Sequence, residues 1–224
     1  MGQCVIEIEH VSKSFKGMQV LNDVNMTCSG GNIYGIVGYN GSGKTVLFKC
    51  ICGFLRVDSG NIAINGKVMG KDLDMLKHTG IIIEEPGYIR SLSGFRNLEY
   101  LYRISNKKDT AAIYAAMLKV GLDPCARKKV CNYSLGMRQR LAIAQATMED
   151  QEILILDEPM NGLDKEGVAE MRKFFSDQRS MGKLILLASH NKEDIEVLCD
   201  EVYEMRHGTL SAIDNLTTVR YNVT

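Results

Sequence analysis

The sequence lacks several features that would place it in other classes of protein. It has no tryptophan and three prolines, and its 27 Lys and Arg residues are balanced by 27 Asp and Glu residues. A neutral chain has no general basic field to hold the phosphates of DNA or RNA, so we expect no nucleic-acid partner. No apolar run approaches the roughly 18 residues that a membrane helix needs, and the first residues do not resemble a signal peptide.

Cysteine is present, but not in the pattern of a disulfide framework. There are seven cysteines, an odd number, scattered through apolar stretches. This usage is typical of a reducing compartment, and we therefore expect a cytoplasmic protein. Cys50 and Cys52 form a C-x-C pair, which we interpret as core thiols rather than metal ligands.

The most informative stretch is residues 38–45, which read Gly-Tyr-Asn-Gly-Ser-Gly-Lys-Thr. Glycines can turn successive backbone N–H groups towards phosphate oxygens, while Lys44 can contact the β- and γ-phosphates and the Thr45 hydroxyl can bind Mg²⁺. A strand-like run precedes the loop and a helical run follows it, so the helix N-terminus points at the phosphates. The pattern predicts a nucleoside triphosphate site made of Gly38, Tyr39, Asn40, Gly41, Ser42, Gly43, Lys44, Thr45 and Val46.

A second chemical element lies at residues 153–158, where four apolar residues are followed by Asp157 and Glu158. A buried strand of this kind delivers its acids to the carboxyl edge of a parallel sheet, where the sites of α/β proteins assemble. We expect Asp157 to hold Mg²⁺ and Glu158 to accept a proton from, or orient, the water that attacks the γ-phosphate.

A third element is the stretch Tyr-Ser-Leu-Gly-Met-Arg-Gln-Arg at residues 133–140. Ser134 stands where an N-cap hydroxyl would, and Gly136 would let backbone amides approach a ligand closely. A helix N-terminus with free amides is an anion site. On spacing alone, a capped core helix without a ligand is an equally good interpretation.

The alternation of buried strands and helices indicates an α/β protein with a parallel core. We expect one domain over residues 1–224, with the RecA-like parallel core of a P-loop NTPase in residues 31–59 and 150–224. An N-terminal antiparallel β subdomain would comprise about residues 1–30 and 60–85, including a hairpin that turns at Asn65-Gly66. Residues 86–149, whose pattern is helical, would form an inserted α-helical subdomain.

Taken together, these residues resemble the ATP-binding subunit of an ABC transporter over nearly the whole chain. Residues 133–137 resemble the Leu-Ser-Gly-Gly-Gln motif of that family, and the Asn-Gly-Leu-Asp run ending at Asp164 resembles its D-loop. His190, after the last apolar core strand, resembles the switch histidine. Phe15 stands where the family stacks an aromatic ring on adenine.

The resemblance implies an ATPase that uses ATP and Mg²⁺, with Glu158 and His190 as catalytic residues. Two subunits would face each other head to tail, so that ATP on the phosphate loop of one is covered by Ser134 and Gly136 of the other. Asp164, in the D-loop, is also expected to bind the nucleotide. A separate membrane permease, docked near residues 84–102, would hold the chain on the inner face of the cell membrane. The alternative is a soluble ATPase of the same architecture that acts as a regulator or assembly scaffold.

The chain departs from the family pattern at a few positions. Glu84 replaces the Q-loop glutamine and is expected to contact Mg²⁺ or its water, with an added charge. Leu135 and Met137 replace a Gly and the Gln of the motif helix, and Val46 replaces a hydroxyl residue. Residues 80–98, with Ile-Glu-Glu-Pro, are similar to bacterial exporters of antimicrobial peptides such as bacitracin and lantibiotics.

Overall fold

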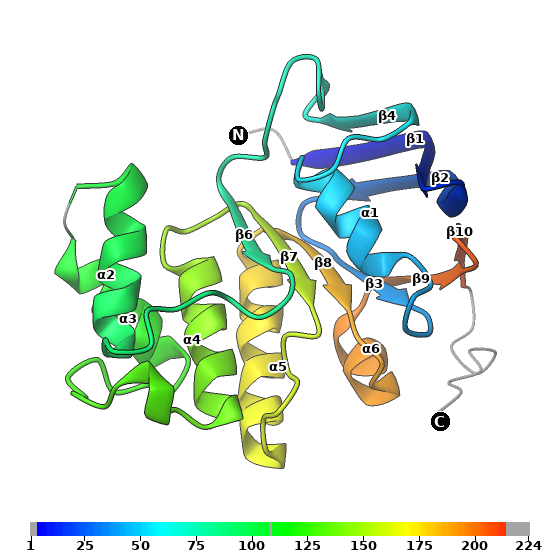
Figure 1. The fold of residues 1–224 in the computed structure, drawn as a ribbon. Helices are drawn as coiled ribbons and strands as arrows, with labels where there is room; N and C mark the ends of the chain where they lie inside the picture. Colours follow the sequence, from blue (N-terminus) through cyan, green and yellow to red (C-terminus); the bar gives the residue numbers. More distant parts are fainter. Residues whose placement is uncertain (1–3, 108, 214–224) are drawn as a thin grey trace.

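Two β-sheets organise the chain in the computed structural model, which describes residues 4–107 and 109–213 (Figure 1). The larger sheet has the strand order β10-β9-β3-β8-β7-β6; its strands are parallel except for the antiparallel pair of β9 and β10. These strands are β3 (Ile33–Val37), β6 (Thr79–Ile82), β7 (Ile153–Asp157), β8 (Leu184–Ala188), β9 (Glu201–Arg206) and β10 (Thr209–Ala212).

The smaller sheet is antiparallel and has the order β2-β1-β4-β5. Its strands are β1 (Val5–Phe15), β2 (Met18–Ser29), β4 (Ser59–Ile64) and β5 (Lys67–Val68). The hairpin predicted at Asn65-Gly66 is confirmed, because both residues have positive φ and the flanking strands β4 and β5 pair. Two long antiparallel strands, β1 and β2, make up most of the predicted range 1–30.

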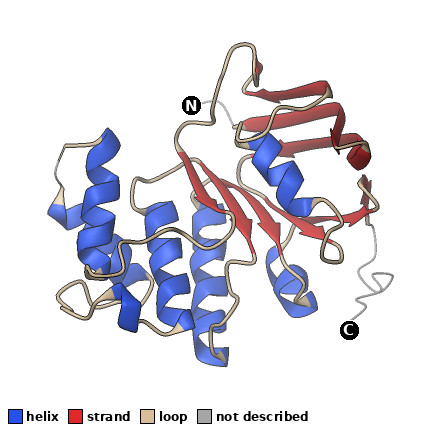
Figure 2. Cartoon of the chain, viewed as in Figure 1, coloured by secondary structure: helices blue, strands red, loops and turns tan. Residues whose placement is uncertain are grey.

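The described residues form six α-helices and one 3₁₀ turn, η1 (Val130–Asn132). Figures 1 and 2 show α2, α3 and α4 gathered beside the core as a helical lobe, and α1 between the two sheets. None of these helices is long and apolar enough to cross a bilayer. The helices are α1 (Lys44–Ile51), α2 (Gly94–Ser105), α3 (Thr110–Lys119), α4 (Leu135–Thr147), α5 (Lys165–Ser180) and α6 (Lys192–Leu198).

The central strands β3, β7 and β8 are apolar at nearly every position because the large sheet is covered on both faces. Successive side chains of a strand point to opposite faces. In β3, Ile33 and Val37 pack with residues of the helical lobe, α5 and α6, while Tyr34 and Ile36 pack with α1 and the antiparallel sheet. The sheet thus separates two hydrophobic cores. Cys50 and Cys52 are buried in the second one, as their assignment as core thiols predicted.

Two of the expected boundaries need correction. Strand β6 was included in the antiparallel subdomain by the range 60–85, but it pairs in parallel with β7 in the large sheet. A short β-branched run has the same pattern in either sheet, so periodicity could not assign it. The helical pattern expected from residue 86 also begins later, because α2 starts at Gly94 after an irregular segment.

The helical lobe is held to the core by close packing of α4 against β6 at Gly80. A Cβ at this position would lie 1.8 Å from the carbonyl oxygen of Ala146 and 2.7 Å from a Leu154 methyl group. The absence of a side chain at Gly80 therefore lets α4, which carries Ser134 as its N-cap, lie against the sheet.

We expect Gly80→Ala to lower the free energy of unfolding by about 1–3 kcal/mol, because the new methyl group must push α4 away from β6. Urea denaturation measures this change. Gly87→Ala is the matched control, since a Cβ at Gly87 meets nothing within 4 Å and its φ is not positive. Equal stability of the two variants would contradict the close packing at Gly80.

Candidate functional site

The phosphate loop, residues 38–45, joins the end of β3 to the start of α1. It is tightly enclosed: a Cβ at Gly38 would lie 2.4 Å from the Met205 carbonyl oxygen, and one at Gly43 would lie 2.9 Å from that of Val20. Gly43 has φ 115° and precedes α1 without a side-chain cap. The first amides of α1 therefore have no capping side chain and are available to an anion.

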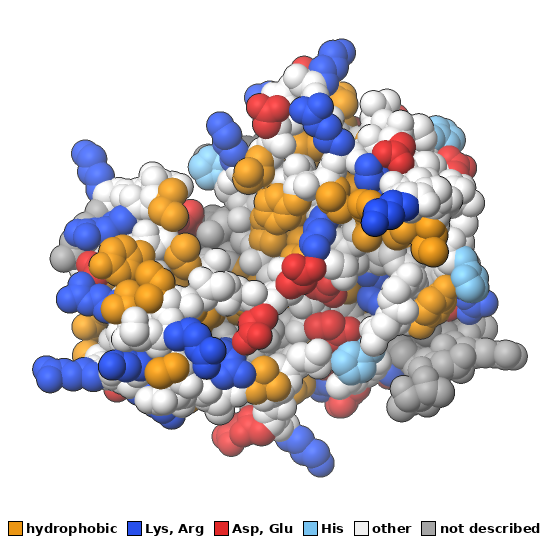
Figure 3. Space-filling view, in the orientation of Figure 1, with side chains coloured by type: hydrophobic (Ala, Val, Ile, Leu, Met, Phe, Trp, Pro, Cys, Tyr) orange, Lys and Arg blue, Asp and Glu red, His pale blue; other side chains and the backbone are white. Residues whose placement is uncertain are grey.

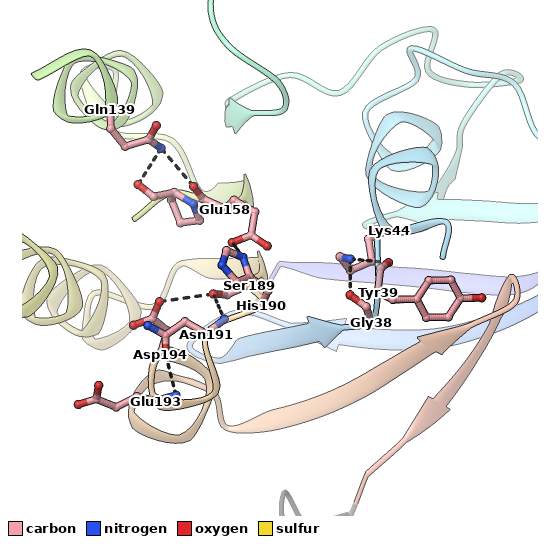
Figure 4. A network of polar contacts seen from close by, with 11 residues as sticks. Gly38, Tyr39, Lys44, Gln139, Glu158, Ser189, His190, Asn191, Glu193 and Asp194 are labelled. Atoms are coloured by element: carbon pink, nitrogen blue, oxygen red, sulfur yellow. Dashed lines mark hydrogen bonds and ion pairs between the residues drawn. The ribbon is translucent and has the colours of Figure 1, made fainter. Parts of the chain in front are cut away.

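The Lys44 side chain folds back across the loop. Its Nζ donates to the carbonyl oxygens of Gly38 at 2.6 Å and Tyr39 at 3.2 Å (Figure 4). Burial lowers the pKa of Lys44, while the charges of Asp157 and Glu158 act in the opposite direction. The ammonium is thus held among carbonyls and near two acids, where a phosphate group would be a stronger partner.

A hydrogen bond joins the phosphate loop to the second motif. The Thr45 hydroxyl donates to Asp157 Oδ2 at 2.6 Å, although these two residues are 112 positions apart in the sequence. The start of α1 therefore meets the end of β7. Hydroxyl and carboxylate oxygens are the hard ligands that Mg²⁺ prefers. The donor atoms at this position therefore fit the magnesium ion that both residues were predicted to hold.

Glu158 follows β7 in a left-handed conformation, with φ 51°. Its backbone N–H donates to the Ala188 carbonyl at 2.9 Å, and its carboxylate Oε2 lies 2.9 Å from Nδ1 of His190 (Figure 4). Burial raises the pKa of Glu158, and the contact with His190 opposes that shift. The two residues predicted as catalytic are thus brought into contact at the end of neighbouring strands.

Hydrogen bonds from neighbouring residues hold the segments that carry Glu158 and His190 in place. Gln139 Nε2 donates to the carbonyl oxygens of Glu158 at 3.3 Å and Pro159 at 2.7 Å, and so links α4 to the turn that carries the acid. On the other side, Ser189 Oγ donates to the buried Asp194 carboxylate at 3.4 Å. Sequence reasoning gave neither Gln139 nor Ser189 a role, although both lie beside predicted motif residues.

One cleft of about 540 Å³ between the core and the helical lobe is lined by Lys44, Thr45, Gln139, Asp157 and Glu158, but not by His190. Glu84 lies in its wall, but its carboxylate is paired with Lys49 Nζ at 2.6 Å, and the neighbouring Glu85 is paired with Arg138 Nε at 3.0 Å. Figure 3 shows acidic side chains gathered in the middle of this face. The cleft thus combines the buried ammonium of Lys44, which suits phosphate, with the carboxylates of Asp157 and Glu158, which suit a magnesium ion.

Ser134, Gly136 and Asp164 line a separate cleft of about 680 Å³. Both polar residues cap helices: Ser134 Oγ accepts from the Met137 N–H, as its sequence context predicted, and Asp164 Oδ1 accepts from the Gly167 N–H. The structure does not bring these three residues to the phosphate loop of the same chain. Their predicted contact with nucleotide therefore requires another subunit.

Phe15 is not among the residues that line the cleft of the phosphate loop. It ends β1, its side chain is partly exposed, and the Lys13 ammonium lies 5.4 Å from its ring centre. Tyr39 does not line that cleft either, whereas Val20 of β2 does. The adenine-stacking role of Phe15 stays a prediction.

Comparison with known proteins agrees with this geometry. A family profile described as ABC transporter matches residues 21–161, more than half of the chain. An uncharacterized ABC transporter ATP-binding protein of Bacillus subtilis is 38% identical over 95% of this chain and 97% of its own length. The bacitracin transport ATP-binding protein of Enterococcus faecalis is 37% identical over 92% of this chain and 68% of its own length. A lantibiotic transport ATP-binding protein of Streptococcus pyogenes is 34% identical, covering 88% and 84%.

Solved structures share the fold at lower sequence identity. The ATP binding subunit of an ABC transporter aligns with a TM-score of 0.83 and 23% identity, over 94% of this chain and 90% of that one. A dimeric bacterial ABC transporter cassette aligns with a TM-score of 0.82 and 19% identity, over 94% and 99%. The chain belongs to the ABC transporter family as an ATP-binding subunit, whose general activity is ATP hydrolysis coupled to transport.

Proposed function

We propose that this chain binds Mg·ATP on its phosphate loop and hydrolyses it between two subunits arranged head to tail. In this way it drives a separate membrane permease that exports an antimicrobial peptide or a similar compound. One observation carries the proposal. Lys44, Thr45, Asp157 and Glu158 line one cleft, the first half-site, and His190 contacts Glu158 from beside it. A second cleft is lined by Ser134, Gly136 and Asp164, which form the other half-site.

In the first half-site, different groups of the chain have different roles in the transfer of the γ-phosphoryl group to water. The loop amides and Lys44 bind the phosphates, and Thr45 and Asp157 would hold Mg²⁺, which neutralises phosphate charge when bound. Glu158 orients the attacking water and accepts its proton. Burial favours this role because a raised pKa makes the carboxylate a better proton acceptor. His190 keeps that carboxylate in position through its 2.9 Å contact.

The second half-site would act on the ATP of a partner subunit. Ser134 and Asp164 cap α4 and α5, and both helix N-termini open on the cleft of about 680 Å³. A helix N-terminus attracts phosphate charge. Head-to-tail pairing places this cleft of each chain over the phosphate loop of the other, so that ATP contributes to the interface between them.

The names of the relatives support the choice of transported compound. Bacitracin and lantibiotics are the antimicrobial peptides named for two relatives at 34–37% identity. A permease partner would hold the chain at the inner face of the cell membrane. We favour this function over a soluble regulator or scaffold because the family profile and the relatives are those of transporters.

Glu158→Gln should keep ATP binding but reduce hydrolysis by roughly 10²- to 10⁴-fold, because the amide fills the same space without accepting the proton. Phosphate release measures turnover, and gel filtration with ATP should show the variant accumulating as a dimer. Lys44→Ala is the contrasting variant and should already fail at ATP binding. Near-normal hydrolysis by Glu158→Gln would rule out this residue as the base.

Ser134→Arg should leave the ATP affinity of the monomer nearly unchanged while lowering ATP-induced dimerisation and hydrolysis. The reason is that Ser134 lies outside the chain's own nucleotide cleft. Ser93→Arg is the matched control, since Ser93 is the N-cap of α2 and its loss has a similar stability cost of about 1 kcal/mol. A proportional fall in monomer affinity would instead assign Ser134 to its own chain's site.

The permease should dock on the helical lobe near residues 84–102, where Ile89 and Tyr100 are about half exposed. Ile89→Asp and Tyr100→Glu should abolish co-purification with an integral membrane protein from detergent-solubilised membranes and leave ATP-induced dimerisation intact. Met181→Glu is the control, because Met181 is similarly exposed but lies at the end of α5. Unchanged co-purification would place the docking surface elsewhere.

A further inference from the structure

The side of the phosphate loop away from the nucleotide cleft packs against the turn between β9 and β10. His207 and Gly208 form this turn with φ 48° and 81°. The Gly208 N–H donates to the Ser42 carbonyl at 3.2 Å, and the Gly208 carbonyl accepts from the Asn22 N–H at 2.8 Å. The hairpin near the end of the chain is therefore bonded both to the phosphate loop and to the antiparallel sheet.

The most specific contact between the loop and this turn is made by Tyr39. Its hydroxyl lies 2.8 Å from His207 Nδ1 and accepts a second hydrogen bond from the His207 backbone N–H at 3.3 Å. The two rings also meet edge to face, with their centres 5.5 Å apart. With Nδ1 as acceptor, the hydroxyl donates to the ring and accepts from the backbone, so both of its functions are used.

The other end of Tyr39 faces the cation of the site. Its carbonyl oxygen accepts from Lys44 Nζ at 3.2 Å and from the Ser42 N–H at 3.1 Å. Figure 4 shows the Tyr39 ring pointing away from Glu158 and His190. Tyr39 therefore connects the position of the hairpin to the backbone that holds Lys44, without its own ring lining the nucleotide cleft.

We propose that the Tyr39–His207 pair is a brace that positions the phosphate loop for nucleotide binding. The proposal rests on the function proposed above and adds two positioning residues to it. A loop with glycine at 38, 41 and 43 has much backbone freedom to lose when it closes on phosphates. A contact that fixes the loop beforehand reduces this entropic cost, and so strengthens binding without taking part in the chemical step.

The test compares His207→Ala, Tyr39→Phe and the double variant. Each single change removes the bond between hydroxyl and ring, and the dissociation constant for ATP, measured by isothermal titration calorimetry, should rise roughly 3- to 10-fold. The kcat at saturating ATP should stay within about twofold. Because both changes break the bond between hydroxyl and ring, the loss of affinity in the double variant should be smaller than the sum of the two single losses.

Two further variants separate positioning from folding. His207→Asn should restore most of the affinity, because Asn tolerates a left-handed φ and its amide oxygen can accept from the Tyr39 hydroxyl. His78→Ala is the matched control, since His78 also has a left-handed φ, 51°, but lies before β6 and outside the lining of the nucleotide cleft. It should bind ATP like the unaltered chain.

Wild-type affinity in both single variants, or losses that add in the double variant, would overturn the brace. A matching loss of affinity in His78→Ala would also overturn it, because the effect would then belong to general stability. Failure of the unaltered chain to bind ATP would instead overturn the proposed function itself. Tyr39→Phe, which keeps the ring, provides the measurement if His207→Ala does not fold.

Discussion

The arrangement of the site depends on the parallel pairing of β3, β8 and β7. In the observed register Ile36 lies opposite Ala188, and Ala188 lies opposite Asp157. Because parallel strands end at the same edge of the sheet, the segments that follow them emerge side by side. The phosphate loop, the acid pair and the loop of His190 follow these strands. Three stretches that are distant in sequence therefore form one site. The register of the sheet is fixed because apolar side chains are buried on both of its faces.

The charges of the cleft connect the core to the helical lobe. Glu84 and Glu85 are adjacent, yet the first is paired with Lys49 of α1 and the second with Arg138 of α4. These carboxylates are largely exposed, so each pair adds little to stability. Their effect is geometric: the segment after β6 is tied to both walls of the nucleotide cleft.

Several residues serve the fold and the proposed chemistry at once. Ser134 and Asp164 satisfy backbone N–H groups at the starts of α4 and α5, and those same helix starts open on the second cleft. For Ser134 the sequence context suggested both capping and ligand contact, and the structure bears out the capping. Gly80 is a comparable case, because the contact it permits between β6 and α4 sets the position of Ser134 at the other end of the helix.

The sequence by itself determined those local elements that have a characteristic residue pattern. The glycines, Lys44 and Thr45 identify a phosphate loop, and an apolar run before Asp157 identifies a buried strand, because these patterns reflect backbone freedom and burial that local sequence controls. Tertiary structure alone decided which distant residues contact the predicted site residues. Lys49 pairs with Glu84, Gln139 donates to the Glu158 carbonyl, and His207 bonds to the Tyr39 hydroxyl. It also assigned β6 to the parallel sheet. Such contacts join residues far apart in the chain, and only the register of the sheet and the packing of its two faces bring them together.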